Sequence, residues 1–109
     1  MENIKSIAVY CGSKSGAKPA YAEAARELGA KMAERGIRLV FGGGRVGIMG
    51  EVADHVLAKG GEVTGVIPHF LEDLEVAHTQ LTELISVESM HERKHIMFTK
   101  SDAFVILPG

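Results

Sequence analysis

Two short segments of this chain carry residue types that suit a phosphorylated ligand. In the first, the apolar run 38–41 (RLVF) leads into residues 42–50 (GGGRVGIMG), which hold five glycines in nine positions. Glycine has no Cβ, so backbone amides can approach an anion, and a following helix adds the positive end of its dipole. Gly42, Gly43 and Gly44 are therefore candidate ligand-binding residues. The alternative is that they form a tight strand-to-helix turn packed against a neighbouring strand.

The second segment is residues 89–97 (SMHERKHIM), where Met90, Arg93, Lys94 and Met97 have the spacing of one helical face. This spacing could direct two cations at an anionic ligand lying over the strand ends. It could equally be a solvated stripe whose long side chains bury their stems. Glu75, in a loop that precedes a predicted strand, could reach the same crevice and accept ribose hydroxyls, or it could be an ordinary solvated acid.

The glycine segment also matches the dinucleotide fingerprint G-x-G-x-x-G at Gly42, Gly44 and Gly47. However, the match follows the second predicted strand rather than the first. The acidic residue expected about 20 positions later, at the end of the next strand, is absent, since Glu62 stands at the start of that strand. The pattern therefore disfavours an NAD(P) site.

Residues 91–95 (HERKH) match the zinc-protease pattern H-E-x-x-H. Histidines four apart share a helix face, but no third ligand of suitable spacing follows apart from Asp102. In addition, Ser89 and Glu92 have the spacing of a capping box, which gives Glu92 a structural role. We expect neither a metal ion nor an organic cofactor.

The remaining candidates for nucleophile or proton transfer are isolated in the sequence. Cys11 has no histidine or acid placed beside it, so packing is the favoured interpretation rather than nucleophilic catalysis. His55, His69 and His78 are predicted to be surface or loop residues.

Composition excludes several classes of protein. The chain has 109 residues, 46% of them apolar and 24% charged, with a net charge of −2. The absence of Lys/Arg runs argues against a nucleic acid or a membrane surface as the main partner. A single cysteine forms no internal disulfide, and we find neither a signal peptide nor an apolar run of about 20 residues. We expect a cytoplasmic protein.

Hydrophobic periodicity predicts alternating strands and helices. The expected strands are residues 4–10, 37–41, 62–67, 84–87 and 103–107, and the expected helices are 19–35, 48–59 and 89–100. Residues 69–83 have no clean period and are predicted to be a connecting loop. This order predicts an α/β fold: one Rossmann-like domain over residues 1–109, a doubly wound parallel sheet with helices on both faces. Ligands of such sheets bind at the carboxyl ends of the strands.

The ordered set of motifs resembles the LOG ("Lonely Guy") family of cytokinin-activating phosphoribohydrolases, long mislabelled as lysine decarboxylases. The resemblance runs through essentially the whole chain. It is carried by VYCGS at 9–13, LGAKMAERGIRLVFGGGRVGIMG at 28–50, GVIP at 65–68, SMHERKHIM at 89–97 and SDAFVILPG at 101–109. It implies a homodimer that hydrolyses the N-glycosidic bond of a purine nucleoside 5′-monophosphate, AMP or an N6-substituted AMP, to free base and ribose 5-phosphate. The competing class is a non-catalytic carrier of a nucleotide or of molybdenum cofactor with the same fold.

The resemblance also assigns roles to residues. Arg93 matches the catalytic arginine of the family, Lys94 its neighbour in the substrate site, and Glu75 a substrate-contacting glutamate. The matches to the loops lining the nucleotide cleft are Gly12, Ser13, Gly42, Gly43, Gly44 and Gly109. Lys14 departs from the second serine common after Gly-Ser. No residue marks a lysine held for a pyridoxal Schiff base.

The last two residues, Pro108 and Gly109, match the start of the family's PGGxGTxxE loop, which binds the phosphate and carries the catalytic glutamate. We therefore expect residues 1–109 to be an N-terminal portion of a longer chain, with impaired activity on their own.

Overall fold

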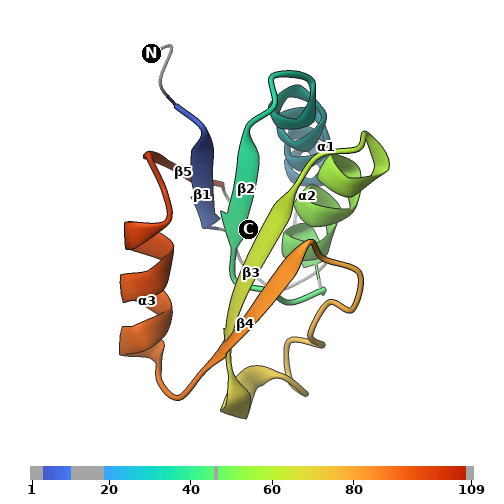
Figure 1. Ribbon diagram of the computed structural model, residues 1–109. Helices are drawn as coiled ribbons and strands as arrows, with labels where there is room; N and C mark the ends of the chain where they lie inside the picture. Colours follow the sequence, from blue (N-terminus) through green and yellow to red (C-terminus); the bar gives the residue numbers. More distant parts are fainter. Residues whose placement is uncertain (1–3, 11–18, 46, 108–109) are drawn as a thin grey trace.

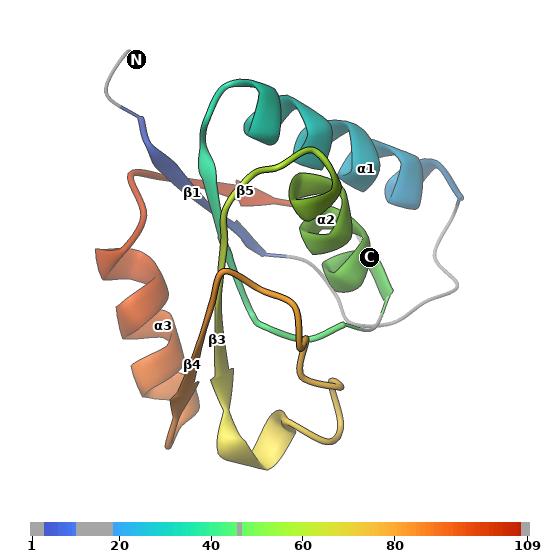
Figure 2. The ribbon, with the colours of Figure 1, turned by 45° about the vertical axis from the view of Figure 1, so that its right-hand side comes forward.

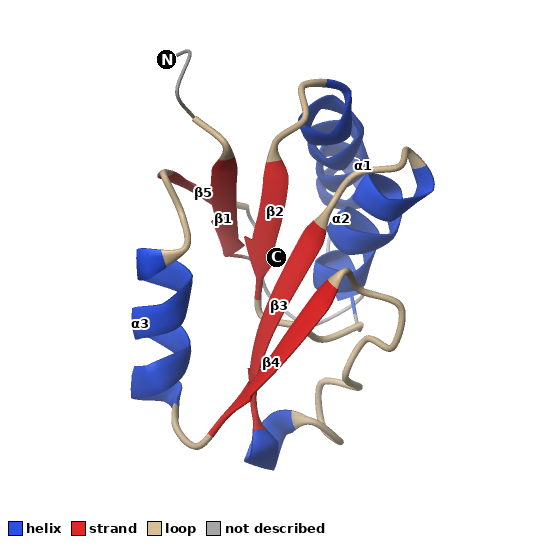
Figure 3. Ribbon diagram, in the orientation of Figure 1, coloured by secondary structure: helices blue, strands red, loops and turns tan. Residues whose placement is uncertain are grey.

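The computed structural model describes residues 4–10, 19–45 and 47–107, and it shows a five-stranded parallel sheet with helices on both faces (Figures 1 and 3). The predicted α/β fold is confirmed. The strands are β1 (Ser6–Tyr10), β2 (Arg38–Phe41), β3 (Val63–Pro68), β4 (Glu83–Val87) and β5 (Ala103–Ile106). The helices are α1 (Pro19–Glu34), α2 (Gly47–Ala58) and α3 (Met90–Thr99), with a short 3₁₀ turn at His69–Leu71.

The strand order is β4-β3-β2-β1-β5, so the chain moves outward from β1 and then returns to the other side of it. Ala8 of β1 accordingly pairs with Val40 of β2 and with Phe104 of β5. Helices α1 and α2 cover one face and α3 covers the other, as the rotated view makes clear (Figure 2). Because all strands are parallel, their carboxyl ends meet at one edge, where ligands of open α/β sheets bind.

The core has two parts, one on each face of the sheet. The larger lies under α1 and α2 and is centred on Leu39, Phe41 and Val56, all almost inaccessible to water. The smaller lies under α3 and includes Val66 and Met97. Every residue of β3 is buried, which explains why its sequence is mostly apolar rather than alternating; the one polar residue, Thr64, has hydrogen-bond partners for its hydroxyl.

The elements predicted from periodicity are all present, with ends displaced by at most two residues. Gly36 ends α1 as predicted: its φ is 67°, its amide donates to Ala33, and the Ile37 amide donates to Met32. Left-handed backbone at that position favours glycine because it has no Cβ. None of the helices within the described ranges is long and apolar enough to cross a bilayer.

The start of α3 confirms the predicted capping box with one difference. The Ser89 Oγ accepts a hydrogen bond from the Glu92 amide at 3.1 Å. The Glu92 carboxylate returns to the amide of Glu88 at 3.0 Å, one residue earlier than the usual partner. Both bonds fix the first turn of α3, and therefore the direction in which Arg93 leaves the helix.

Candidate functional site

Arg93 joins three segments at the carboxyl end of the sheet. Its guanidinium lies under α3 with only 8% of the residue exposed. The Nε donates to the carbonyl of Val66 in β3 at 2.9 Å. The Nη2 donates to the carbonyl of Gly42, directly after β2, and to the Glu75 carboxylate at 2.8 Å. One side chain therefore links β3, the glycine loop and the loop that carries Glu75.

The pair that Arg93 forms with Glu75 makes the burial of its charge tolerable. A buried cation without a partner costs several kcal/mol, whereas here a carboxylate and two carbonyls surround it. The Glu75 side chain is 14% exposed, and its Oε2 has no hydrogen-bond partner within the described part of the chain. Glu75 therefore presents one carboxylate oxygen, held in place by an arginine, that can accept hydroxyl groups of a ligand.

The three consecutive glycines are buried, and each leaves room for a neighbour. A Cβ on Gly42 would lie 2.3 Å from the Arg93 Nη2, and one on Gly44 would lie 2.7 Å from the Glu75 carbonyl. Gly43 has a φ of 82° and packs against Ile67. The glycine loop is therefore closely packed, as expected for the alternative interpretation of a tight strand-to-helix turn against a neighbouring strand. Contact of its amides with a ligand stays a prediction.

The loop from Glu72 to Thr82 pairs with the glycine loop through main-chain hydrogen bonds. Gly44 and Ala77 form an antiparallel bridge, and the Arg45 amide donates to the Glu75 carbonyl at 3.0 Å. Val76 has a φ of 53°, which is unusual for a β-branched residue. This turn brings the Glu75 side chain over the glycine loop to Arg93.

His78 was predicted to be a surface or loop residue, and it lies in the loop before β4 but not at the surface. The imidazole is fully buried and bonded at both nitrogens. The Nε2 lies 2.7 Å from the Asp54 Oδ1 on α2, and the Nδ1 accepts the Gln80 amide at 3.1 Å. The partner on α2 stands 24 residues earlier in the chain, so no local pattern could have identified this contact.

The structure brings Arg93, Lys94 and Gly42 to one small cavity of about 100 Å³ at the carboxyl ends of β1 and β2. The surroundings of the two cations differ: Arg93 is buried, whereas Lys94 is exposed. Glu75 belongs to this site through its pair with Arg93. Of the other predicted residues, Gly12, Ser13 and Gly109 lie outside the described residues.

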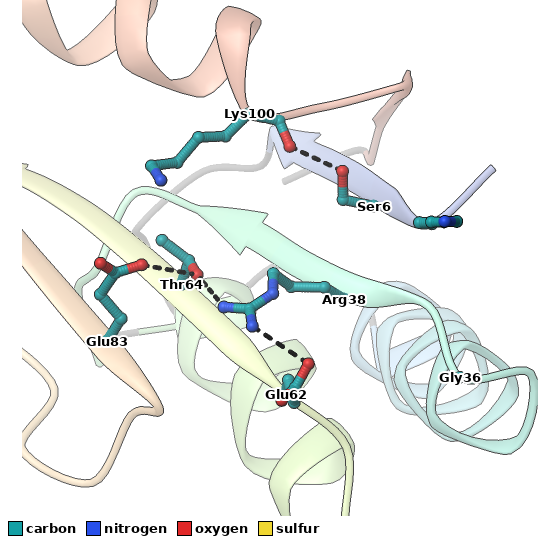
Figure 4. Close-up of a pocket in the computed structure, with 8 residues that line it drawn as sticks. Ser6, Gly36, Arg38, Glu62, Thr64, Glu83 and Lys100 are labelled. Atoms are coloured by element: carbon teal, nitrogen blue, oxygen red, sulfur yellow. Dashed lines mark hydrogen bonds and ion pairs between the residues drawn. The ribbon is translucent and has the colours of Figure 1, made fainter. Parts of the chain in front are cut away.

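A second hollow lies at the opposite, amino end of the sheet, and its polar groups largely satisfy one another (Figure 4). Arg38 pairs with Glu62 at 3.0 Å and donates to the Thr64 hydroxyl at 2.6 Å. That hydroxyl in turn donates to Glu83 at 3.3 Å. These interactions leave the carboxyl end, with Arg93 and Glu75, as the candidate functional site.

Sequence comparisons identify curated relatives that are named for the same enzymatic activity. A family model described as "Possible lysine decarboxylase" matches residues 49–109. The probable cytokinin riboside 5′-monophosphate phosphoribohydrolase LOGL9 of Oryza sativa subsp. japonica is 50% identical over 97% of this chain and 47% of the relative. The cytokinin riboside 5′-monophosphate phosphoribohydrolase of Rhodococcoides fascians is 46% identical over 96% of this chain and 54% of the relative. The chain thus spans about half the length of the curated relatives it matches.

Comparison with solved structures supports the fold. The Moco carrier protein from Chlamydomonas reinhardtii superposes with a TM-score of 0.80 at 23% identity, covering 98% of this chain and 64% of that one. The molybdenum cofactor binding protein from Rippkaea orientalis gives a TM-score of 0.80 at 20% identity, with the same shares covered. At such low identity the likeness establishes the Rossmann-like fold alone.

Proposed function

The chain belongs to the LOG family, whose family model is described as a possible lysine decarboxylase, and from this membership we propose that the protein hydrolyses the N-glycosidic bond of purine nucleoside 5′-monophosphates. The products would be the free base, adenine or an N6-substituted adenine, and ribose 5-phosphate. The observation that carries the proposal is the pair of Arg93 with Glu75 at the ligand-binding edge of the sheet.

The chemistry of this bond suits a positioned carboxylate. When the base leaves, positive charge builds on the ribose, much as in glycoside hydrolysis. In this proposal the open oxygen of Glu75 accepts ribose hydroxyls, and Arg93 holds that carboxylate in one orientation. Lys94, exposed beside the same cavity, would contribute charge toward the phosphate together with the loop amides at Gly12, Ser13, Gly42, Gly43, Gly44 and Gly109.

The decarboxylase description of the family model finds no support in these residues. A pyridoxal-dependent enzyme needs a lysine whose amine is held for a Schiff base. Each lysine within the described residues is exposed, namely Lys5, Lys31, Lys59, Lys94 and Lys100.

The experiment that tests the proposal incubates the full-length protein, expressed from its gene, with AMP and with N6-isopentenyl-AMP. Release of free base is followed by chromatography. Adenosine serves as the control, because a site built for a monophosphate should act poorly on a nucleoside without phosphate. If neither nucleotide releases its base, the proposal is overturned. Nucleotide binding without product would favour the carrier class.

The family resemblance further suggests a homodimer, and the composition of the chain suggests that it acts in the cytoplasm. Light scattering of the full-length protein measures the first, and fractionation of the source cells measures the second. A monomeric mass would contradict the proposed assembly without bearing on the chemistry.

A further inference from the structure

The segment that carries Glu75 reaches Arg93 without the support of a helix or strand. Its turn depends on Val76, whose φ of 53° lies in the left-handed region, which is strained for a β-branched residue. Such a conformation persists only where the surrounding structure determines it. The main-chain bonds to the glycine loop supply part of that support. Both loops, however, are short irregular segments that need an anchor on a regular element.

His78 provides that anchor, three residues after Glu75. Its Nδ1 accepts the Gln80 amide, so the ring proton lies on Nε2 and is donated to Asp54 of α2. Its own amide donates to the Gly43 carbonyl at 2.9 Å. One buried residue therefore ties the Glu75 loop both to α2 and to the glycine loop whose carbonyl at Gly42 receives Arg93.

We infer that His78 and Asp54 are positioning residues for the Glu75–Arg93 pair, holding the Glu75 carboxylate in the orientation that binds substrate. This inference rests on the proposed function for its activity readout. Neither residue touches the substrate in this view. Their effect passes through the loop, because a shift of about 1 Å at a catalytic group can cost a hundredfold in rate.

The competing view is that His78 merely fills the core. The substitution Asp54→Ala separates the two views, because it removes the hydrogen-bond partner of His78 and leaves the imidazole in place. Asp54 is half-exposed and alanine is a good helix former, so the substitution itself should not disturb α2. Glu51→Ala is the matched control: it lies one turn earlier on α2, loses the same charge and removes the carboxylate contacts with Arg26 and His55 instead. We expect Asp54→Ala to lower kcat/KM about tenfold and Glu51→Ala to change it less than twofold.

Two substitutions of His78 each remove one of the two hydrogen bonds of its ring and keep the other. His78→Gln can still direct an amide N–H toward Asp54 but loses the ring acceptor for Gln80. His78→Asn retains a local acceptor for the Gln80 amide but is too short for Asp54. A positioning role predicts that Gln rescues activity better than Asn at equal thermal stability. A core-filling role predicts that activity follows stability in both variants.

The decisive measurement is a double-mutant cycle in the full-length protein. If Asp54 acts through Glu75, then Asp54→Ala should change kcat/KM less than twofold in a Glu75→Gln background. Additive losses would overturn the inference. A lower Tm of the Asp54→Ala variant with unchanged kcat/KM would also overturn the inference.

Hydrogen exchange distinguishes failure of this inference from failure of the proposed function. In Asp54→Ala the amides of Arg45 and His78, which donate into the paired loops, should exchange at least tenfold faster, while that of Val66 in β3 should not. If exchange is faster in this way but the protein releases no base, the anchoring role of His78 and Asp54 is supported and the proposed reaction is rejected. Unchanged exchange at Arg45 and His78 would reject the anchor whatever the activity.

Discussion

The Nη2 of Arg93 and the Oε1 of Glu75 lie 2.8 Å apart, although the two residues stand 18 positions apart in the chain. The arginine comes from the first turns of α3, and the glutamate comes from the irregular loop before β4. Both side chains are mostly shielded from water, at 9% and 14% exposure. The pair is therefore the point at which two independently positioned segments of the fold meet.

Glu75→Gln should lower base release by roughly tenfold or more, because the amide keeps the shape but removes the charge that orients Arg93. The free energy of unfolding should fall by about 1–3 kcal/mol, since a buried cation loses its anionic partner. Chromatographic rates and chemical denaturation measure the two effects. Asp73→Asn, an exposed acid of the same loop, is the control and should alter neither.

Neighbouring cations of α3 should respond differently to substitution. Arg93→Lys cannot keep the bonds to Val66 and Gly42 together with the pair to Glu75, so stability should fall by about 2–3 kcal/mol along with activity. Thermal denaturation and kinetics of the full-length protein measure both. A stable, active Arg93→Lys variant would contradict the bridging role.

Lys94→Ala should leave stability within about 0.5 kcal/mol of the parent, because the residue is exposed. If Lys94 attracts the phosphate, KM for AMP should rise roughly threefold to tenfold and the increase should shrink at high salt. Kinetics at low and high ionic strength test this expectation. A salt-independent KM equal to that of the parent would remove Lys94 from the site.

Gly42→Ala should abolish most activity through a steric effect alone, because the added Cβ would lie 2.3 Å from the Arg93 Nη2. Gly36→Ala provides the contrast. Its Cβ would meet nothing within 4 Å, but its φ of 67° strains alanine, so it should cost about 1 kcal/mol of stability without loss of activity. Equal activity of Gly42→Ala and the parent would show that Arg93 does not need its present position.

Asp102 should contribute stability that depends on pH. Its carboxylate accepts the amides of Lys5 and Ser6, and these hydrogen bonds hold the pKa of Asp102 below its usual value. A lowered pKa in the folded state means that the contribution is present above the pKa of the unfolded chain and is lost as pH falls through the folded pKa. Asp102→Asn should therefore be less stable than the parent at pH 7, and the two should converge in strong acid. Denaturation midpoints across that range measure the difference.

Features of the fold that have a local cause could be predicted from the sequence. Glycine at the end of α1, the Ser89 cap of α3 and the strand over residues 62–67 each follow from neighbouring residues, and the structure contains all three, the strand as β3. The parallel sheet follows because strands that alternate with helices pair in this way.

Contacts between segments that are distant in the chain could not be predicted in the same way. The spacing of Arg93 and Lys94 placed both on one helical face, yet the orientation of α3 on the sheet buries one and exposes the other. The buried bond between His78 and Asp54 joins segments with no shared period, so only the folded arrangement reveals it.

The bridge between Gly44 and Ala77 has a consequence for how this chain can vary. Because main-chain atoms of both loops pair, side chains at Thr79 or Gln80, which are exposed, can change with little effect, whereas the count of residues cannot. Adding or removing one residue between Glu75 and His78 would change the register of the paired loops and turn the carboxylate away from α3. Besides Glu75 and His78 themselves, the spacing between them is therefore the property that an engineer or a natural lineage must keep in this segment.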